Sequence, residues 1–149
     1  MKPNKFIAIL LFVFLLEALA GAAWAGSRIN IIVKTVLASQ GASFIDPGLS
    51  SLTQDLQSVF RYSSYRLLSQ DRMSLKLNQT GTTTLPGKRM LKITPLRISG
   101  NRVALRLAIH KKGRQIFETA IQLLNRGRIT VGGPKYKGGY LLFNVFSSF

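Results

Sequence analysis

The chain contains no cysteine, a single histidine and only five acidic residues among its 149 residues. The absence of cysteine excludes disulfide bonds, thiolate ligands for metals, cysteine nucleophiles and attachment of a lipid to cysteine. The few carboxylates and the single histidine leave little material for acid–base catalysis or for metal binding. We therefore expect no catalytic residue, no metal site and no cofactor, and we do not expect an enzyme.

Basic residues greatly outnumber acidic ones. There are 21 lysines and arginines against 5 aspartates and glutamates, which gives a formal net charge of +16. Hydrophobic residues make up 46% of the chain, a fraction that is too high for a disordered basic tail and sufficient for a core. Because the length suits one domain, the sequence predicts a single folded domain with a strongly basic surface.

Residues 1–25 have the pattern of a secretory signal peptide. A basic start is followed by eleven apolar residues from Phe6 to Leu16 and then by the small residues of a cleavage site in Ala23-Trp24-Ala25. Eleven residues are too few to cross a bilayer as a helix, which takes about 20. We expect cleavage before Gly26, which leaves 19 basic and 4 acidic residues in a domain at 26–149. The protein would then be exported to the periplasm or the extracellular space; an uncleaved anchor is the alternative.

One helix is expected, over residues 47–60. Asp46 has the position of an N-cap, and Pro47 suits the first helical residue because its missing N–H would have no partner there. The residues that follow are apolar at helical spacing, with polar residues on the opposite side. The apolar set is Leu49, Leu52, Leu56, Val59 and Phe60.

Most of the remaining sequence alternates with a period of two and predicts strands. Short connections rich in turn residues favour antiparallel neighbours. We expect a β-rich α+β fold: a mostly antiparallel meander of about eight strands, shaped as a sandwich or a partly open barrel, with one N-terminal amphipathic helix. The partner of the first strand is left open. The expected strands are 28–38, 62–69, 72–79, 88–98, 102–111, 115–124, 128–132 and 139–146.

Apolar alternation also predicts the register of the central hairpins. A tight turn at Gly100-Asn101 places Ile98 opposite Val103 and Leu96 opposite Leu105. The alternation changes phase at Thr94-Pro95. We expect a β-bulge there, because proline cannot donate a hydrogen bond to the ladder.

The next turn, over residues 112–114, places Glu118 opposite Ala108 and Ile116 opposite His110. We interpret His110 as a surface residue at a strand end, and Glu118 as a structural ion-pair partner of Arg106. A hydrolase with an unrecognised site is a minor alternative. It would need a concave site lined by several of His110, Glu118, Asp71 and Asp46.

Seven basic residues fall at turns that an antiparallel meander brings to one end of the sheet, because every second turn returns to that end. Their charge would attract phosphate, sulfate or carboxylate groups. The alternative is solvated charge that keeps a β-rich protein soluble. The candidate anion-binding residues are Lys88, Arg89, Lys111, Lys112, Arg114, Lys135 and Lys137.

Residues 125–133 combine a glycine turn, a short β-branched strand and a glycine pair. This segment locally resembles a stretch near the end of outer-membrane secretin channels. The resemblance covers about ten residues, consists mostly of the pattern of a hairpin, and transfers no functional residue. It implies, as an expectation, an accessory role in an envelope export or pilus machine.

These features favour an exported, non-enzymatic binding or envelope-assembly module with a strongly basic surface. Its expected partner is anionic: a lipid headgroup, lipopolysaccharide, an acidic polymer or an acidic envelope protein, which includes peripheral contact with a membrane. The alternative is an accessory or structural subunit of a cell-envelope secretion or pilus complex. Nucleic acid is not expected, because the sequence has no helix-turn-helix or zinc-finger pattern and no basic strand interleaved with aromatic residues.

Overall fold

Two β-sheets and one short helical segment make up residues 26–149, which are the residues that the computed structural model describes. The signal peptide expected for residues 1–25 lies outside the described residues. The first sheet contains β1 (Ile29–Ser39), β2 (Phe44–Ile45), β3 (Ser64–Leu75), β8 (Gly127–Tyr136) and β9 (Gly139–Ser148), in the order β2-β3-β1-β9-β8. The second sheet contains, in this order, β4 (Gly81–Leu85), β5 (Arg89–Ser99), β6 (Arg102–Lys111) and β7 (Arg114–Leu124).

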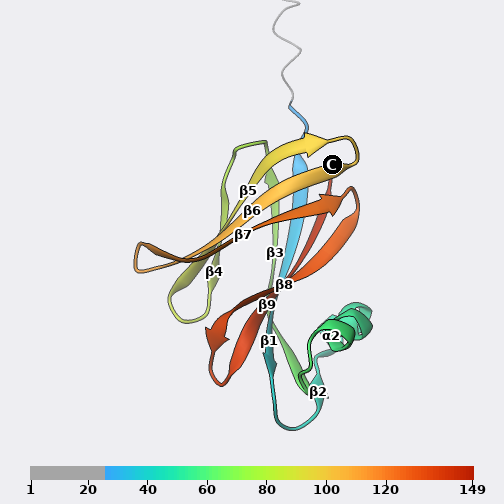
Figure 1. The fold of residues 1–149 in the computed structure, drawn as a ribbon, viewed down its shortest axis with the longest axis vertical. Helices are drawn as coiled ribbons and strands as arrows, with labels where there is room; N and C mark the ends of the chain where they lie inside the picture. Colours follow the sequence, from blue (N-terminus) through green and yellow to red (C-terminus); the bar gives the residue numbers. More distant parts are fainter. Residues whose placement is uncertain (1–25) are drawn as a thin grey trace, which may run out of the picture.

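The expected β-rich α+β fold with mostly antiparallel strands is confirmed. The described residues form nine strands, and only the short β2–β3 pair is parallel. The second sheet crosses the upper half of the first at a steep angle, as Figure 1 shows. The strand whose partner was left open, β1, lies in the middle of the first sheet between β3 and β9.

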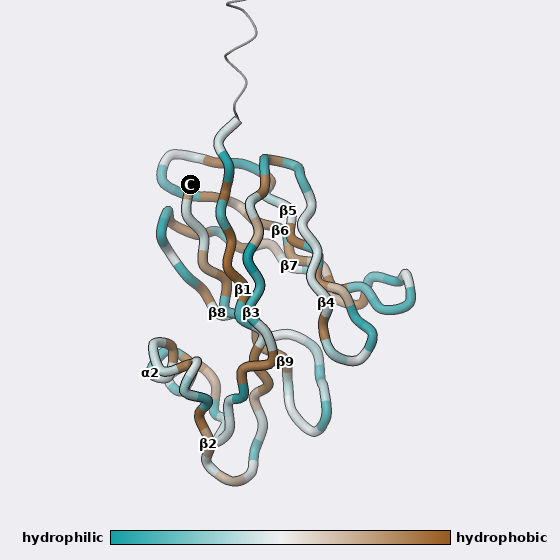
Figure 2. Tube along the Cα trace, turned by 180° about the vertical axis from the view of Figure 1, so that it is seen from behind, coloured by the Kyte–Doolittle hydropathy of each residue, from teal (hydrophilic) through white to brown (hydrophobic). Residues whose placement is uncertain are grey.

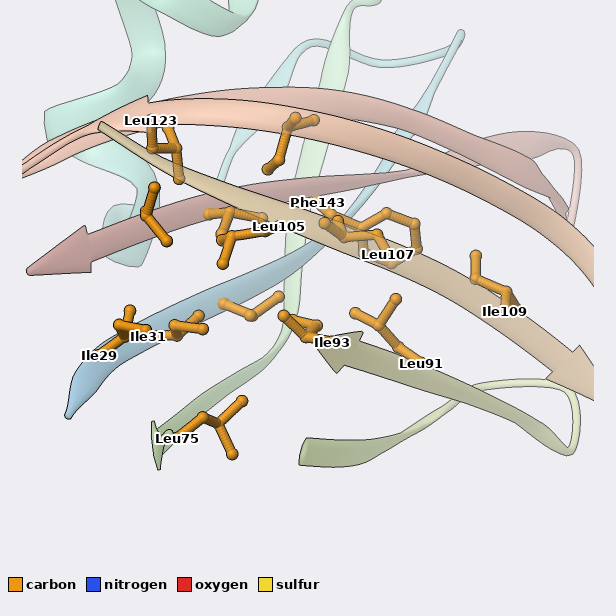
Figure 3. Packing of buried hydrophobic residues seen from close by; sticks show 14 of the residues in the cluster. Ile29, Ile31, Leu75, Leu91, Ile93, Leu105, Leu107, Ile109, Leu123 and Phe143 are labelled. Atoms are coloured by element: carbon orange, nitrogen blue, oxygen red, sulfur yellow. The ribbon is translucent and has the colours of Figure 1, made fainter. Parts of the chain in front are cut away.

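The main core lies between the two sheets. Leu105 and Leu107 of β6 are fully buried, and they face Ile31 and Phe143 of the first sheet (Figure 3). Arg106, between the two leucines, is exposed. The alternation along β6 therefore places its apolar side chains inward, as the sequence predicts.

A second core lies on the opposite face of the first sheet, under the helical segment. This segment begins as a 3₁₀ helix, η1 (Pro47–Leu52), and continues as α2 (Thr53–Val59). The Asp46 side chain accepts a hydrogen bond from the Gly48 N–H at 2.9 Å, which confirms the expected cap. Val59 is 69% exposed, so its assignment to the apolar face was wrong. The buried cluster comprises Val36, Ala38, Leu49, Leu52, Leu56, Tyr65 and Leu142.

The Tyr65 hydroxyl fastens this segment to the sheet. Its oxygen accepts a hydrogen bond from the Tyr62 N–H, and the hydroxyl donates to the carbonyl oxygens of Phe60 and Leu56. The side chain is buried, and burial raises the pKa of the Tyr65 hydroxyl above its ordinary value near 10. The raised pKa means that the folded protein favours the protonated hydroxyl.

Two expected strand boundaries were wrong. β3 continues without a break through Gln70-Asp71, because its ladder with β1 satisfies the backbone and overrides local turn propensity. β4 occupies Gly81–Leu85, where a connection between strands was expected, and it pairs with β5. Its three consecutive threonines are β-branched residues that suit a strand.

β8 also extends beyond its expected end, through Gly132-Gly133-Pro134. Its register with β9 shifts between Gly132 and Lys135, which places the proline in a bulge. A Cβ atom on Gly133 would lie 2.5 Å from the Phe143 ring. Only glycine fits there. Gly133 therefore does not mark a turn, as its sequence context suggests, but allows the Phe143 ring to pack against the backbone of β8.

The bulge expected at Thr94-Pro95 is present one residue further on. The β5–β6 register shifts between Pro95 and Arg97, so Pro95 lies opposite Leu105. Leu96 is unpaired and exposed, and its expected pairing with Leu105 was wrong. The pairing of Ile98 with Val103 is confirmed.

We expect Leu107→Ala to lower the free energy of unfolding by roughly 2–5 kcal/mol, because it removes fully buried methyl groups and leaves a cavity. Arg106→Ala should change it by about 0.5 kcal/mol or less, because the side chain is exposed. Urea denaturation followed by circular dichroism measures both values. A larger loss in Arg106→Ala would show that β6 faces the other way.

Tyr65→Phe should lower the free energy of unfolding at pH 7 by about 1–3 kcal/mol, because the partly buried Phe60 carbonyl oxygen and Tyr62 N–H lose the hydroxyl as their partner. The raised pKa predicts that the stability contributed by Tyr65 is complete below about pH 10 and is lost as the pH rises further. The difference in stability between wild type and Tyr65→Phe should therefore shrink as the pH rises above about 10 in urea titrations. An unchanged difference would contradict the assigned protonation state.

Candidate anion-binding site

Three hairpin turns lie on the same side of the molecule: β4–β5, β6–β7 and β8–β9 (Figures 1 and 2). The β6–β7 turn consists of Lys112-Gly113 and the β8–β9 turn of Lys137-Gly138, and all four residues have positive φ. Two consecutive residues of positive φ are typical of type I′ turns, which match the twist of the flanking strands. The local geometry therefore carries lysine side chains to this end.

The hairpin ends enclose a concave site of about 550 Å³, which we call the basic hollow. Four of the seven predicted anion-binding residues line it: Arg89, Lys111, Lys135 and Lys137. The other three lie in the adjoining turns and at the start of β7, outside the lining. The remaining lining residues are Gly87, Tyr136, Gly138, Gly139 and Tyr140.

The register places cations directly opposite one another at this end of the second sheet. Arg89 pairs with Lys111, and Lys111 pairs with Arg114. Like charges in opposite positions destabilise a sheet. No carboxylate of residues 26–149 lines the basic hollow to offset this repulsion.

Two tyrosine rings lie close to three of the four cations of the basic hollow. The Arg89 guanidinium carbon lies 5.9 Å from the centre of the Tyr136 ring, and the Lys137 ammonium lies 5.5 Å from the same ring. The Lys135 ammonium lies 5.7 Å from the centre of the Tyr140 ring, and the two residues pair across the β8–β9 ladder. Each contact is worth about 0.5–1 kcal/mol at an exposed site and limits the motion of the cation.

The Arg89 guanidinium lacks acceptors. Its Nε and Nη1 atoms are buried, and neither has a hydrogen-bond partner within the described part of the chain. A buried polar group without a partner costs free energy, and the cost is greater for a charged group. An anion that enters the basic hollow could attract the guanidinium. It would then supply the hydrogen-bond acceptor that Arg89 lacks.

Two glycines shape the basic hollow: Gly139 lies against the first sheet, and Gly87 lies beside the Tyr136 ring. A Cβ atom on Gly139 would lie 2.3 Å from the carbonyl oxygen of Ala38, so the β8–β9 turn meets β1 more closely than any side chain allows. At Gly87, a Cβ atom would lie 3.5 Å from the Tyr136 ring and would narrow the hollow. The lysines were predictable from the sequence, whereas Tyr140 was not among the predicted anion-binding residues; its signal is its place after the Gly138-Gly139 pair.

The single histidine lies elsewhere, on the outer face of the second sheet. His110 and Glu118 line a concave site of about 420 Å³ together with Arg106 and Lys92. Ile116 is not opposite His110 as expected: the β6–β7 register shifts there, and Gln115 takes the position. His110 lies two residues beyond Ala108, the partner of Glu118, so strand alternation places the histidine and the carboxylate on the same face. Glu118 lies opposite Ala108, as expected.

The other two carboxylates of the minor hydrolase hypothesis do not join this site. Asp46 caps η1, and Asp71 accepts a hydrogen bond from the Ser69 hydroxyl at 3.1 Å on β3. No group of three or more histidine, aspartate or glutamate side chains within residues 26–149 is arranged to hold a metal ion. None of the helices in this range has the length and apolar character needed to cross a membrane.

No known protein family matches the chain, and no curated protein matches it. Among solved structures, the type III secretion injectisome secretin InvG of Salmonella SPI-1 (residues 176-end, open gate state) is similar over 97% of this chain, at 12% identity and a TM-score of 0.27. The chain spans 63% of the length of that structure's chain. A TM-score at this level does not establish a shared fold.

Proposed function

We propose that the protein is a non-enzymatic binding module of the cell envelope that uses the basic hollow to hold an anionic group of its partner. The observation that carries the proposal is the convergence of Arg89, Lys111, Lys135 and Lys137 on one concave site with no carboxylate in its lining. Three hairpins from both sheets contribute to this site. Charge spread over turns for solubility alone does not require such a convergence.

Phosphate and carboxylate groups fit this site. The Arg89 guanidinium can donate two parallel hydrogen bonds to either group, and three lysine ammonium groups add point charges around it. Tyr136 and Tyr140 also line the basic hollow, and a tyrosine hydroxyl can donate a further hydrogen bond. An anion in this position would relieve the repulsion between Arg89 and Lys111 and would supply an acceptor for the guanidinium.

Lipid headgroups, lipopolysaccharide phosphates and acidic polymers carry such groups, and each suits an exported protein. The formal charge of residues 26–149, with 19 basic and 4 acidic residues, would draw the protein towards any of these surfaces. Binding would depend on salt because counterions are displaced and the charges are screened. The proposal includes peripheral contact with a membrane.

The second candidate function is an accessory or structural subunit of a cell-envelope secretion or pilus complex. The observation that favours it is the resemblance of residues 125–133 to a segment of outer-membrane secretins. These residues form the β7–β8 turn and the first part of β8, which is an edge strand of the first sheet. An edge strand offers unpaired backbone groups to a strand of another protein.

We expect a variant with Lys111→Gln, Lys135→Gln and Lys137→Gln to lose retention on phosphatidylglycerol vesicles at about 0.1 M salt, where screening acts over about 10 Å. The matched control replaces Lys88, Lys112 and Arg114 by glutamine, which removes the same charge from the same end but leaves the lining intact. Vesicle sedimentation and a heparin column measure retention on a lipid and on a polymer.

Loss in the first variant with retention in the control would support the basic hollow as the binding site. Equal loss of retention in both variants would show that the charge at this end of the molecule acts without a defined binding site. Retention of the first variant on both supports would refute the proposal. Thermal melts of wild type and both variants establish whether each protein is folded.

A further inference from the structure

The outer face of the first sheet, turned away from the second sheet, is a separate basic surface. The helical segment packs on the part of this face near Val36 and Leu142, and its residues Ser51 and Leu52 line the border of the exposed part. Figure 2 looks onto this side, with α2 beside the lower half of the sheet. Two adjoining concave sites lie next to the helical segment, of about 320 and 430 Å³, and both have Ile32 and Arg72 in their linings.

The strand register arranges four side chains of this face in one row. Ile32 of β1 lies opposite Arg72 of β3 and Phe146 of β9, and Phe146 lies opposite Arg128 of β8. Because neighbouring strands are about 4.8 Å apart, the two arginines stand on either side of an apolar strip, separated by three strand spacings. We call Arg72, Ile32, Phe146 and Arg128 the cross-strand row.

The next row on the same face is polar. Lys34 lies opposite Gln70 and Asn144, and Asn144 lies opposite Thr130. Asn144 is only 6% exposed, and its Nδ2 donates to the Thr130 hydroxyl at 2.9 Å. This bond holds the amide in one orientation at the edge of the concave site. Amide and hydroxyl groups can both donate and accept hydrogen bonds.

The arginines of the cross-strand row have no partner of opposite charge in the linings. Lys34 and Arg28, at the two ends of this face, donate to the carbonyl oxygens of Gly48 and Ser74, respectively. Neither Arg72 nor Arg128 makes a side-chain hydrogen bond to another residue of 26–149, and both are exposed. The two concave sites contain no carboxylate of the described chain. This face is complementary to a ligand that carries negative charge.

We propose that the cross-strand row and its polar neighbours bind an anionic oligosaccharide. The C–H face of a sugar ring would pack on Ile32 and Phe146, its hydroxyls would pair with the amide and hydroxyl side chains, and its carboxylate or phosphate would meet Arg72 or Arg128. An acidic amphipathic helix needs a run of apolar anchors, whereas this face offers two. Single-stranded nucleic acid needs several stacking aromatics, whereas this face offers Phe146 alone.

The test uses the folded chain from residue 26 and hexagalacturonate, a linear oligosaccharide with a carboxylate on each ring. Backbone amide NMR should show shifts in β1, β8 and β9 around the cross-strand row, and the fully methyl-esterified, neutral hexamer should cause none. A variant with Arg72→Gln and Arg128→Gln should bind about tenfold more weakly, as expected when charged hydrogen bonds are lost. Phe146→Leu should also weaken binding, although it leaves the charge unchanged.

The matched control replaces Arg97 and Arg102 by glutamine; both residues are exposed and neither lines the concave sites described above. It should bind like wild type. Equal weakening in the control, shifts confined to the basic hollow, or no binding would overturn the proposal. Shifts at the cross-strand row with oligothymidylate or an acidic helical peptide, but not with hexagalacturonate, would also overturn it. If Phe146→Leu does not fold, the two arginine variants decide the outcome.

This proposal is independent of the proposed function, because the two surfaces share no residue. Neutralising Lys111, Lys135 and Lys137 should leave hexagalacturonate shifts at the cross-strand row in place. Neutralising Arg72 and Arg128 should leave vesicle retention in place. The two proposals can therefore fail separately.

Discussion

The central position of β1 determines both cores and both basic surfaces. This strand is paired along its whole length, with β3 on one side and β9 on the other. Its first half turns Ile31 and Val33 towards the second sheet, and its second half turns Val36 and Ala38 towards the helical segment. The register with β3 shifts between Thr35 and Val36, where the packing changes from one face to the other. One strand thus divides the first sheet into a half that packs on a sheet and a half that packs on a helix.

The two basic surfaces follow from this division. Because the second sheet covers only one face of the upper half, the other face is left free and carries the cross-strand row. At the far end of β1, the carbonyl of Ala38 meets Gly139 so closely that the β8–β9 turn must lie against it. That contact sets the position of Lys137 and Tyr136 beside Arg89, and so shapes the basic hollow. The scarcity of carboxylates then leaves both surfaces positive.

Local alternation was sufficient to predict the meander of β5, β6 and β7, including the inward direction of Leu105 and Leu107. Each of these strands has one buried face, and a slip of one residue would expose it. The tight turns were also predictable, and with them the lysines at one end. Where the prediction was wrong, a contact between residues distant in sequence determines the structure. The pairing with β1 extends β3 through a turn-like sequence, and the Phe143 ring requires Gly133 inside β8.

The candidate sites depend even more on contacts that are distant in sequence. Arg72 and Arg128 become neighbours of Ile32 and Phe146 only when β3, β1, β9 and β8 assemble in that order. The order places the first strand of the described chain beside the last, and no local pattern indicates it. In the same way, the β6–β7 register skips Ile116 and places Gln115 opposite His110, a change that the alternation of apolar residues does not indicate. Burial and alternation predict faces, but they do not predict which faces meet.

An anion in the basic hollow is expected to reduce the repulsion between Arg89 and Lys111 and to accept a hydrogen bond from the Arg89 guanidinium. The most direct measurement is the thermal unfolding midpoint of residues 26–149 in sodium phosphate and in sodium chloride at equal ionic strength, for wild type and Arg89→Gln. A ligand that binds only the folded state raises the midpoint, and the general stabilising effect of phosphate on burial acts equally on both proteins. The account predicts a higher midpoint in phosphate for wild type and a clearly smaller rise for Arg89→Gln. The same rise in both proteins would contradict it.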